Sequence, residues 1–136
     1  MKIRTLLLMV IVQLGIFNIA NARDVIIGTD VVALGDNEAN MFYQGRAFNH
    51  SAYRISGSSS TDTTTNKNTL TAGLGFRFYF DRYADSPYIE GDILFANNTN
   101  ETGAKVGVDL RLGNIIIDPY ISTLTRSYGV NIGLRL

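Results

Sequence analysis

Apolar and polar side chains alternate along most of the second half of the chain. In the clearest segment, LTAGLGFRFYFD at residues 70–81, all the even positions are apolar, and the odd positions hold Thr, Gly, Arg, Tyr and Asp. A period of two places the two sets on opposite faces of a β-strand, whereas a helix would spread the apolar side chains around its axis. The pattern recurs at 103–113 and 127–136, and less regularly at 87–96 and 115–123. These segments predict five strands.

The first half of the chain is less regular. Residues 23–34 (RDVIIGTDVVAL) predict one strand, residues 41–57 predict one long strand or two short ones, and the Ser, Thr and Asn-rich stretch 56–69 predicts a long loop. An outer-membrane barrel normally keeps both chain ends on the periplasmic side, which requires an even number of strands. Dividing 41–57 at Asn49-His50-Ser51 gives eight strands, and no helix of useful length remains.

Strict alternation suits two environments: a water-soluble barrel or sandwich with apolar side chains inside, or a membrane barrel with apolar side chains facing lipid. The polar face of the strands decides between these two environments. It is rich in glycine, as at Gly73, Gly75 and Gly107, and it carries charges in the middle of strands. Glycines fit the narrow interior of a small barrel. The sequence therefore predicts an all-β fold, an eight-stranded antiparallel up-and-down transmembrane β-barrel.

Buried charges persist only when they are paired, and the predicted inward charges are close to balanced. Closing the hairpins at the turn residues places Arg77 opposite Asp92, and Glu90 opposite Arg111. It also places Asp109 opposite both Asp92 and Asp118, and Asp118 opposite Gly133 and diagonal to Arg135. The predicted charge network in the lumen comprises Arg77, Glu90, Asp92, Lys105, Asp109, Arg111, Asp118 and Arg135.

The N-terminal segment has the features of a secretory signal peptide. Lys2 and Arg4 precede an apolar run at residues 6–17, and Ala20-Asn21-Ala22 supplies small residues for cleavage before Arg23. We expect residues 1–22 to be removed and residues 23–136 to form the barrel. Cleavage leaves ten basic and twelve acidic residues, so nucleic acid is not an expected partner. The chain has no cysteine, which excludes disulfides, zinc-thiolate sites and thiol nucleophiles.

Together, the signal, the eight alternating strands and the apolar C-terminal strand resemble the small outer-membrane β-barrels, the group of OmpX and the OmpA transmembrane domain. This resemblance implies a Gram-negative outer-membrane location, contact with outer-membrane lipid, and recognition of the last strand by the barrel-assembly machinery. The apolar positions that match this assembly signal are Tyr128, Val130, Ile132, Leu134 and Leu136. Leu136 stands where the group usually has an aromatic residue.

An eight-stranded barrel has room inside only for side chains, so we expect a plugged lumen rather than an open porin-like pore. The first functional hypothesis is a structural or surface-interaction protein whose loop 57–68 meets an extracellular partner. We expect no metal, because Asp62 and the carboxylates of 36–38 and 97–101 lie in separate loops. We also expect no cofactor and no enzymatic activity.

Two alternatives stay open. One is a soluble periplasmic barrel that encloses a small apolar ligand between Leu70, Leu74, Phe76, Phe78, Val106 and Leu110. The other is a lipid A-modifying enzyme that uses the single histidine, His50, with Ser51 or with Asp85-Ser86. A catalytic histidine must lie within hydrogen-bond reach of its serine, and the predicted topology places His50 at a periplasmic turn.

Overall fold

The computed structural model describes residues 24–62, 64–96 and 99–136, and this part of the chain forms antiparallel β-strands with one short helix. The elements in chain order are β1 (Ile26–Asp30), α2 (Val31–Gly35), β2 (Glu38–Phe48), β3 (Ser51–Asp62), β4 (Lys67–Tyr79), β5 (Pro87–Phe95), β6 (Asn100–Val108), β7 (Leu110–Leu112), β8 (Ile115–Ser122) and β9 (Tyr128–Arg135). No helix in these ranges is long and apolar enough to span a membrane.

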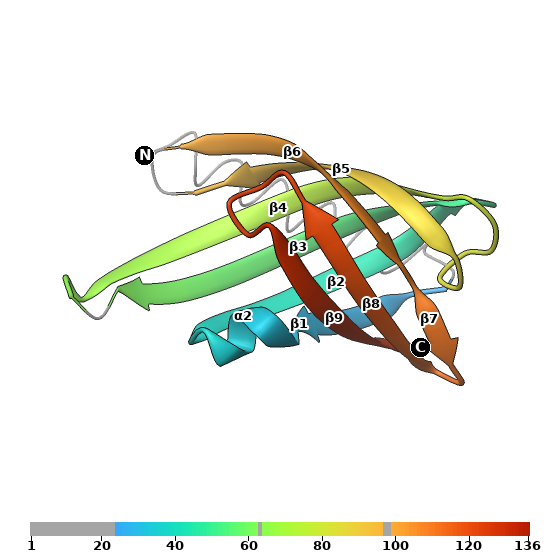
Figure 1. The fold of residues 1–136 in the computed structure, drawn as a ribbon, viewed down its shortest axis with the longest axis horizontal. Coiled ribbons are helices and arrows are strands. Elements are labelled where there is room, and N and C mark those ends of the chain that lie inside the picture. The colour runs from blue at the N-terminus through green and yellow to red at the C-terminus, as the bar shows by residue number, and fades with distance from the viewer. Residues whose placement is uncertain (1–23, 63, 97–98) are drawn as a thin grey trace.

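The sheet closes on itself as a barrel (Figure 1). Consecutive strands pair with each other except β6 and β7, which both pair with β8, and β1 pairs with β9. Because β7 continues the line of β6 beyond Asp109, the ring has eight positions although it contains nine strands. The predicted eight-stranded antiparallel barrel is confirmed, with β7 as an additional short strand.

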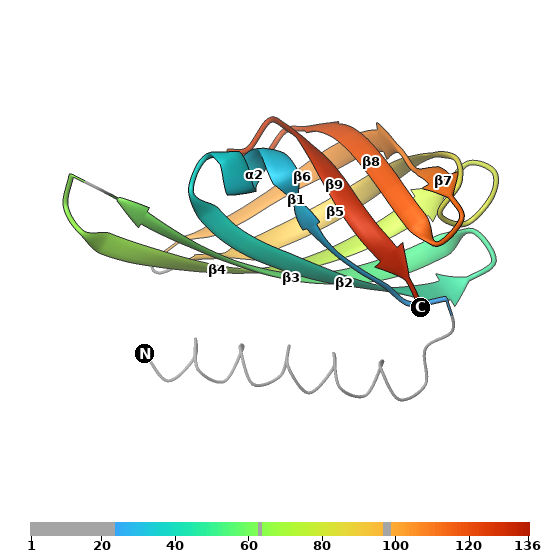
Figure 2. The same ribbon diagram turned by 90° about the horizontal axis from the view of Figure 1, so that it is seen from below.

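The two ends of the barrel differ. At the end that we call the terminal end, the Leu136 N–H donates to the Val25 carbonyl at 2.9 Å, so the C-terminus lies beside the start of β1. The connections after β2, β4 and β7 lie at the same end. The opposite end, the helix end, carries α2, the β3–β4 hairpin and the turn 123–127, and the hairpin extends well beyond the other strands (Figure 2).

Three sequence expectations concern the first half of the barrel. The division at residues 49–51 is confirmed, because β2 ends at Phe48 and β3 begins at Ser51. The predicted loop 57–68 is wrong in most of its length, since the β3–β4 ladder continues to the Asp62–Lys67 pair. Ser and Thr fit a pleated strand, so a polar composition did not exclude pairing. The predicted signal peptide, residues 1–22, and Arg23 lie outside the described residues.

The predicted strand 23–34 ends early, because the chain turns into α2 after Asp30. The Asp30 carboxylate accepts hydrogen bonds from the backbone N–H groups of Val32 (3.0 Å) and Ala33 (3.2 Å), which caps the helix N-terminus. The apolar run VVAL was predicted to continue the strand, but the capping aspartate starts a helix there. This helix places Ala33 and Asp36 at the rim of the barrel interior.

The barrel has apolar side chains outside and polar side chains inside. Phe76 on the outer face is 52% exposed, whereas Arg77, next to it on the inner face, is 1% exposed. Large exposed apolar side chains occur on every described strand except β3. Five of the six side chains that the apolar-ligand alternative placed inside the barrel are exposed on the outside, namely Leu70, Phe76, Phe78, Val106 and Leu110.

Glycines on the inner face make room for tyrosine rings. Tyr88 lies directly across from Gly107, and a Cβ at Gly107 would lie 2.6 Å from both the Tyr88 hydroxyl and the Pro119 carbonyl oxygen. Tyr120 lies across from Gly129 in the same relationship. On the inner face, a tyrosine ring on one strand therefore fills the space left by a glycine on the neighbouring strand.

Replacing Gly107 with valine should destabilise the barrel by about 1–3 kcal/mol, because the new side chain would overlap a backbone oxygen that cannot move aside. Urea unfolding of the protein in detergent would measure the loss. The matched control is Gly91→Val, since a Cβ at Gly91 on the outer face meets no atom within 4 Å. Equal urea midpoints for the two variants would contradict this packing.

Candidate functional site

Arg77 is the centre of an ion cluster inside the barrel. Its Nε donates to Glu90 at 2.7 Å, and its two terminal nitrogens donate to Asp109 at 3.0 Å and to Asp118 at 3.2 Å. Three carboxylates from three different strand segments thus share one guanidinium. Two further cations contact the same carboxylates, so we define the central ion cluster as Arg54, Arg77, Glu90, Lys105, Asp109 and Asp118.

The cluster is balanced in charge and is braced by neutral groups. The hydroxyl of Tyr79 donates to Asp109, and the hydroxyl of Tyr88 donates to Asp118 at 2.6 Å. The Asn131 amide donates to Asp118 at 3.0 Å, and the Gln44 amide donates to Tyr79 at 2.8 Å. Because every carboxylate of the cluster has a partner, burial of these charges is compensated. These side chains fill the interior between the middle of the barrel and its terminal end.

Five of the predicted inward charges, Arg77, Glu90, Lys105, Asp109 and Asp118, are thus brought together in the cluster, but the predicted register between strands is wrong at several places. Arg77 pairs with Glu90 rather than Asp92, and Glu90 pairs with Lys105 rather than Arg111. Asp92 lies across from Gly103 rather than Asp109. Between β5 and β6 the reason lies in the turn after β5, where the Ala96 N–H donates to the Thr99 carbonyl, so β6 begins earlier than predicted.

The register between β8 and β9 also differs from the prediction. Asp118 pairs with Asn131, not with Gly133. The Ser122 hydroxyl donates to the Arg126 carbonyl and accepts from the Leu124 N–H, so the connection takes five residues, 123–127, instead of two. Asp109 was expected opposite Asp118, and the neighbouring pairs agree with this register. Gly107 pairs with Tyr120, and Leu110 pairs with Ile117.

Arg111 and Arg135 do not join the central ion cluster. Arg111 is exposed on β7 and donates to the Gly113 carbonyl at 3.0 Å. Arg135 pairs with Asp24 at the terminal end, and so the predicted partnership of Arg135 with Asp118 is wrong. Asp24 also accepts from Arg46 at 3.0 Å. The hydrogen bond from Arg135, together with that from Arg46, lowers the pKa of Asp24 despite partial burial.

This lowered pKa predicts a pH dependence of stability. The folded state favours the Asp24 carboxylate, so its contribution is present above the ordinary aspartate pKa and is lost as the pH falls through the lowered value. Asp24→Asn should unfold at a lower urea concentration than the wild type at about pH 6, by less than about 1 kcal/mol because the pair is partly exposed. The difference should shrink towards about pH 3. A difference that grows on acidification would contradict the assignment.

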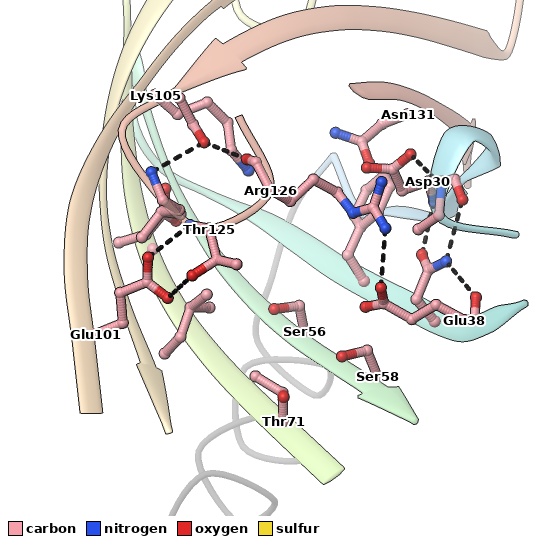
Figure 3. A pocket seen from close by; sticks show the side chains of 18 of the residues that line it. Asp30, Glu38, Ser56, Ser58, Thr71, Glu101, Lys105, Thr125, Arg126 and Asn131 are labelled. Atoms are coloured by element: carbon pink, nitrogen blue, oxygen red, sulfur yellow. Dashed lines mark hydrogen bonds and ion pairs between the residues drawn. The ribbon is translucent and has the colours of Figure 1, made fainter. Parts of the chain in front are cut away.

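A polar cavity of about 620 Å³ occupies the other half of the interior and opens at the helix end (Figure 3). Its floor is the Arg54, Glu90 and Lys105 side of the central ion cluster. The hydroxyls of Ser56, Ser58 and Thr71 lie on one wall, with Asp30, Glu38 and Asn131 on the other. The interior is therefore filled in the half towards the terminal end and hollow in the half towards the helix end. The sequence predicted a plugged lumen and did not distinguish these two halves.

Hydrogen bonds between turns and strands hold the mouth of this cavity. Arg126, on the turn 123–127, reaches to Glu38 at 3.1 Å and to Asp36 at 3.2 Å. Across the mouth, Glu101 accepts from the backbone and the hydroxyl of Thr125 at 2.6 and 2.9 Å. The turn 123–127 is thus attached both to the start of β2 and to β6.

The histidine suggested by the lipid A alternative lies at the terminal end. The ring Nδ1 of His50 contacts the Asp81 carbonyl oxygen. The Ser86 hydroxyl donates to the backbone carbonyls of Arg82 and Pro87. Among the described residues no hydrogen bond joins His50 to a serine, and no group of three or more metal-ligating side chains is placed to hold a metal ion.

Arg54, the second arginine of the interior, was not predicted from the sequence. It lies on β3 at the inward alternation of residues 52, 54 and 56, next to the turn that was placed at residues 49–51. Counting alternate positions along β3 from that turn would have identified Arg54 as an inward residue. Gln44 was missed because a single neutral polar residue within an apolar strand carries a weaker signal than a charge, and Asp30 was missed because the predicted strand 23–34 continued past it.

Comparisons with known proteins add no family: no protein-family model, curated protein or solved structure matches this chain.

Proposed function

We propose that this chain is an integral outer-membrane β-barrel protein with a structural or surface-interaction role. The observation that carries the proposal is the polarity of the barrel, with charged side chains buried inside and large apolar side chains exposed outside. Phe76 on β4 and Ile132 on β9, four positions apart in the ring of eight, are both exposed. The apolar surface therefore occurs on opposite sides of the barrel.

Water is an unfavourable solvent for such a surface. Soluble monomers rarely expose a contiguous apolar patch larger than a few hundred Å². A β-barrel in lipid requires the observed arrangement, with all backbone groups paired in a closed ring, apolar side chains outside and polar side chains inside. The exposed apolar side chains on β4, β5, β8 and β9 support lipid as the surrounding solvent.

The two ends suggest an orientation. Small outer-membrane barrels keep their chain termini in the periplasm, so the terminal end would face inward and the helix end outward. In this orientation the cavity and the β3–β4 hairpin face the cell exterior, where they are positioned to contact partners. The central ion cluster closes the interior below the cavity, so we propose no diffusion pore.

The test is the behaviour of the full-length protein expressed with its N-terminal segment in a Gram-negative host. We expect it to fractionate with the outer membrane, to resist extraction by alkaline carbonate, and to shift in gel mobility on boiling. Depletion of the host barrel-assembly machinery should reduce the folded band, which tests the role proposed for the C-terminal strand. A protein that stays monomeric in buffer without detergent would overturn the proposal.

A further inference from the structure

We propose that the cavity at the helix end binds a neutral saccharide, with Arg54 and Asp92 at its floor as the recognising groups. The cavity volume of about 620 Å³ lies within the ~300–1,000 Å³ that is typical of small-molecule sites. The inference rests on the proposed function only for the side of the membrane from which the sugar would arrive. Binding itself depends on the folded barrel alone.

The first observation is a buried guanidinium whose hydrogen-bonding capacity is unused. Arg54 is 6% exposed, and its Nε is buried without a hydrogen-bond partner. Its ion pairs with Glu90 and Asp118 are both 3.9 Å long, which exceeds hydrogen-bond length. By contrast, each of the three guanidinium nitrogens of Arg77 donates within 3.2 Å. Arg54 lines the cavity, so a ligand at its floor would meet this guanidinium group.

The second observation is an unused acceptor at the same level of the barrel. The Oδ2 of Asp92 is buried and has no hydrogen-bond partner. Gly75 lies between Arg54 and Asp92 on the intervening strand and pairs with both. Because Gly75 has no side chain, the Asp92 carboxylate extends over this position, and a Cβ at Gly75 would lie 2.4 Å from the Asp92 Oδ1. A ligand hydroxyl can accept a hydrogen bond from Arg54 and donate one to Asp92, so a single hydroxyl would satisfy both residues.

The cavity walls favour a neutral ligand with several hydroxyls. The described lining residues include six carboxylates and only three cationic side chains, which disfavours an anion. A small cation would approach Arg54 and Lys105 on the floor, and like charges repel. Above the floor, Ser56, Ser58, Ser60 and Thr71 present hydroxyls that can each donate and accept. These features together fit a saccharide better than a charged metabolite.

The test is saturation-transfer NMR on the folded protein in lauryldimethylamine oxide, since a detergent with a sugar headgroup would compete. The probes are glucose, galactose, N-acetylglucosamine and maltose at millimolar concentration, with spermidine and inorganic phosphate as charged probes. We expect a signal from at least one saccharide. Arg54→Met and Asp92→Leu should each weaken its binding by about tenfold or more, because each removes hydrogen bonds to a charged group.

Two further variants keep the test decisive if a floor variant fails to fold. Ser58→Trp fills the cavity from its wall and should abolish binding while the gel shift on boiling persists, whereas Arg46→Met, at the terminal end, should leave binding unchanged. Absence of any saccharide signal, binding of spermidine or phosphate alone, or saccharide binding that survives Ser58→Trp would overturn the inference. None of these results would alter the outer-membrane proposal, because its fractionation test does not involve the cavity.

Discussion

Replacing Arg77 with methionine should prevent stable folding of the barrel. The substitution removes the partner that Glu90, Asp109 and Asp118 share and leaves three carboxylates buried around an apolar side chain. Removing one member of a buried ion pair costs about 3–5 kcal/mol, and here one residue serves three pairs. The fraction of protein in the folded gel band, measured against urea in lipid vesicles, reports the loss.

The matched control is Arg111→Met, which removes an exposed arginine that donates to the Gly113 carbonyl. This control should unfold within about 0.5 kcal/mol of the wild type. A double variant, Arg77→Met with Asp109→Asn, should recover part of the lost stability, because among the described residues Asp109 forms an ion pair with Arg77 alone and is left uncompensated by the single substitution. A single variant as stable as the control would show that the central ion cluster does not hold the interior together.

Arginine at the outer position of Phe76 or Ile132 should destabilise the barrel in lipid vesicles by about 2–4 kcal/mol, the cost of a basic side chain at the bilayer midplane. Both side chains are exposed on the outside of the described barrel, and they lie on opposite sides of the ring. Urea titration of the folded band in vesicles measures the effect. If water surrounded the barrel instead, the same substitutions would raise solubility without lowering stability.

The control for these two substitutions is Asn68→Arg, because at Asn68 β4 pairs with β3 but has not yet reached its ladder with β5, which begins at Ala72. The β3–β4 hairpin extends beyond the other strands (Figure 2). A charge there should be tolerated, because that position would project past the lipid. Equal losses at Phe76, Ile132 and Asn68 would contradict an apolar band confined to the middle of the barrel.

The sequence was sufficient to predict the class of fold, because alternation reports directly which side chains share a face of a strand. It placed Arg77, Glu90, Asp109 and Asp118 on one face, and the structure brings these four side chains together. It could not predict which residues pair between strands. Pairing depends on turn length, and the turns 96–99 and 123–127 are closed by hydrogen bonds that composition does not reveal.

Aromatic residues illustrate a second limit. Phe80, Tyr83, Tyr88, Phe95 and Tyr128 lie near the ends of predicted strands, where a membrane barrel would place its interfacial aromatic residues. Phe80 and Tyr128 are exposed, but Tyr83 and Tyr88 are buried in the interior. The ring of Tyr88 lies over the Arg77 guanidinium, 3.5 Å from its Cζ, in the space above Gly107. Whether an aromatic side chain faces lipid or fills the lumen depends on the residue across the strand pair, and so on the register.

The cavity was not foreseeable from composition. It exists because inward positions towards the helix end carry Gly75, Ser56, Ser58 and Thr71, whereas those towards the terminal end carry Tyr79 and Tyr88. The difference in side-chain volume between the two halves becomes visible only after the register is known.

The most direct test of the central claim is a nitroxide scan along β4 in lipid vesicles, which the absence of native cysteine makes straightforward. Single cysteines replace each of residues 70–78 except Arg77, and collision with oxygen, enriched in lipid, is compared with collision with a water-soluble nickel chelate. We expect oxygen accessibility to peak at the even positions and to fall at the odd ones, with a period of two. Even positions that are more accessible to the nickel chelate than to oxygen would contradict a lipid-facing apolar surface.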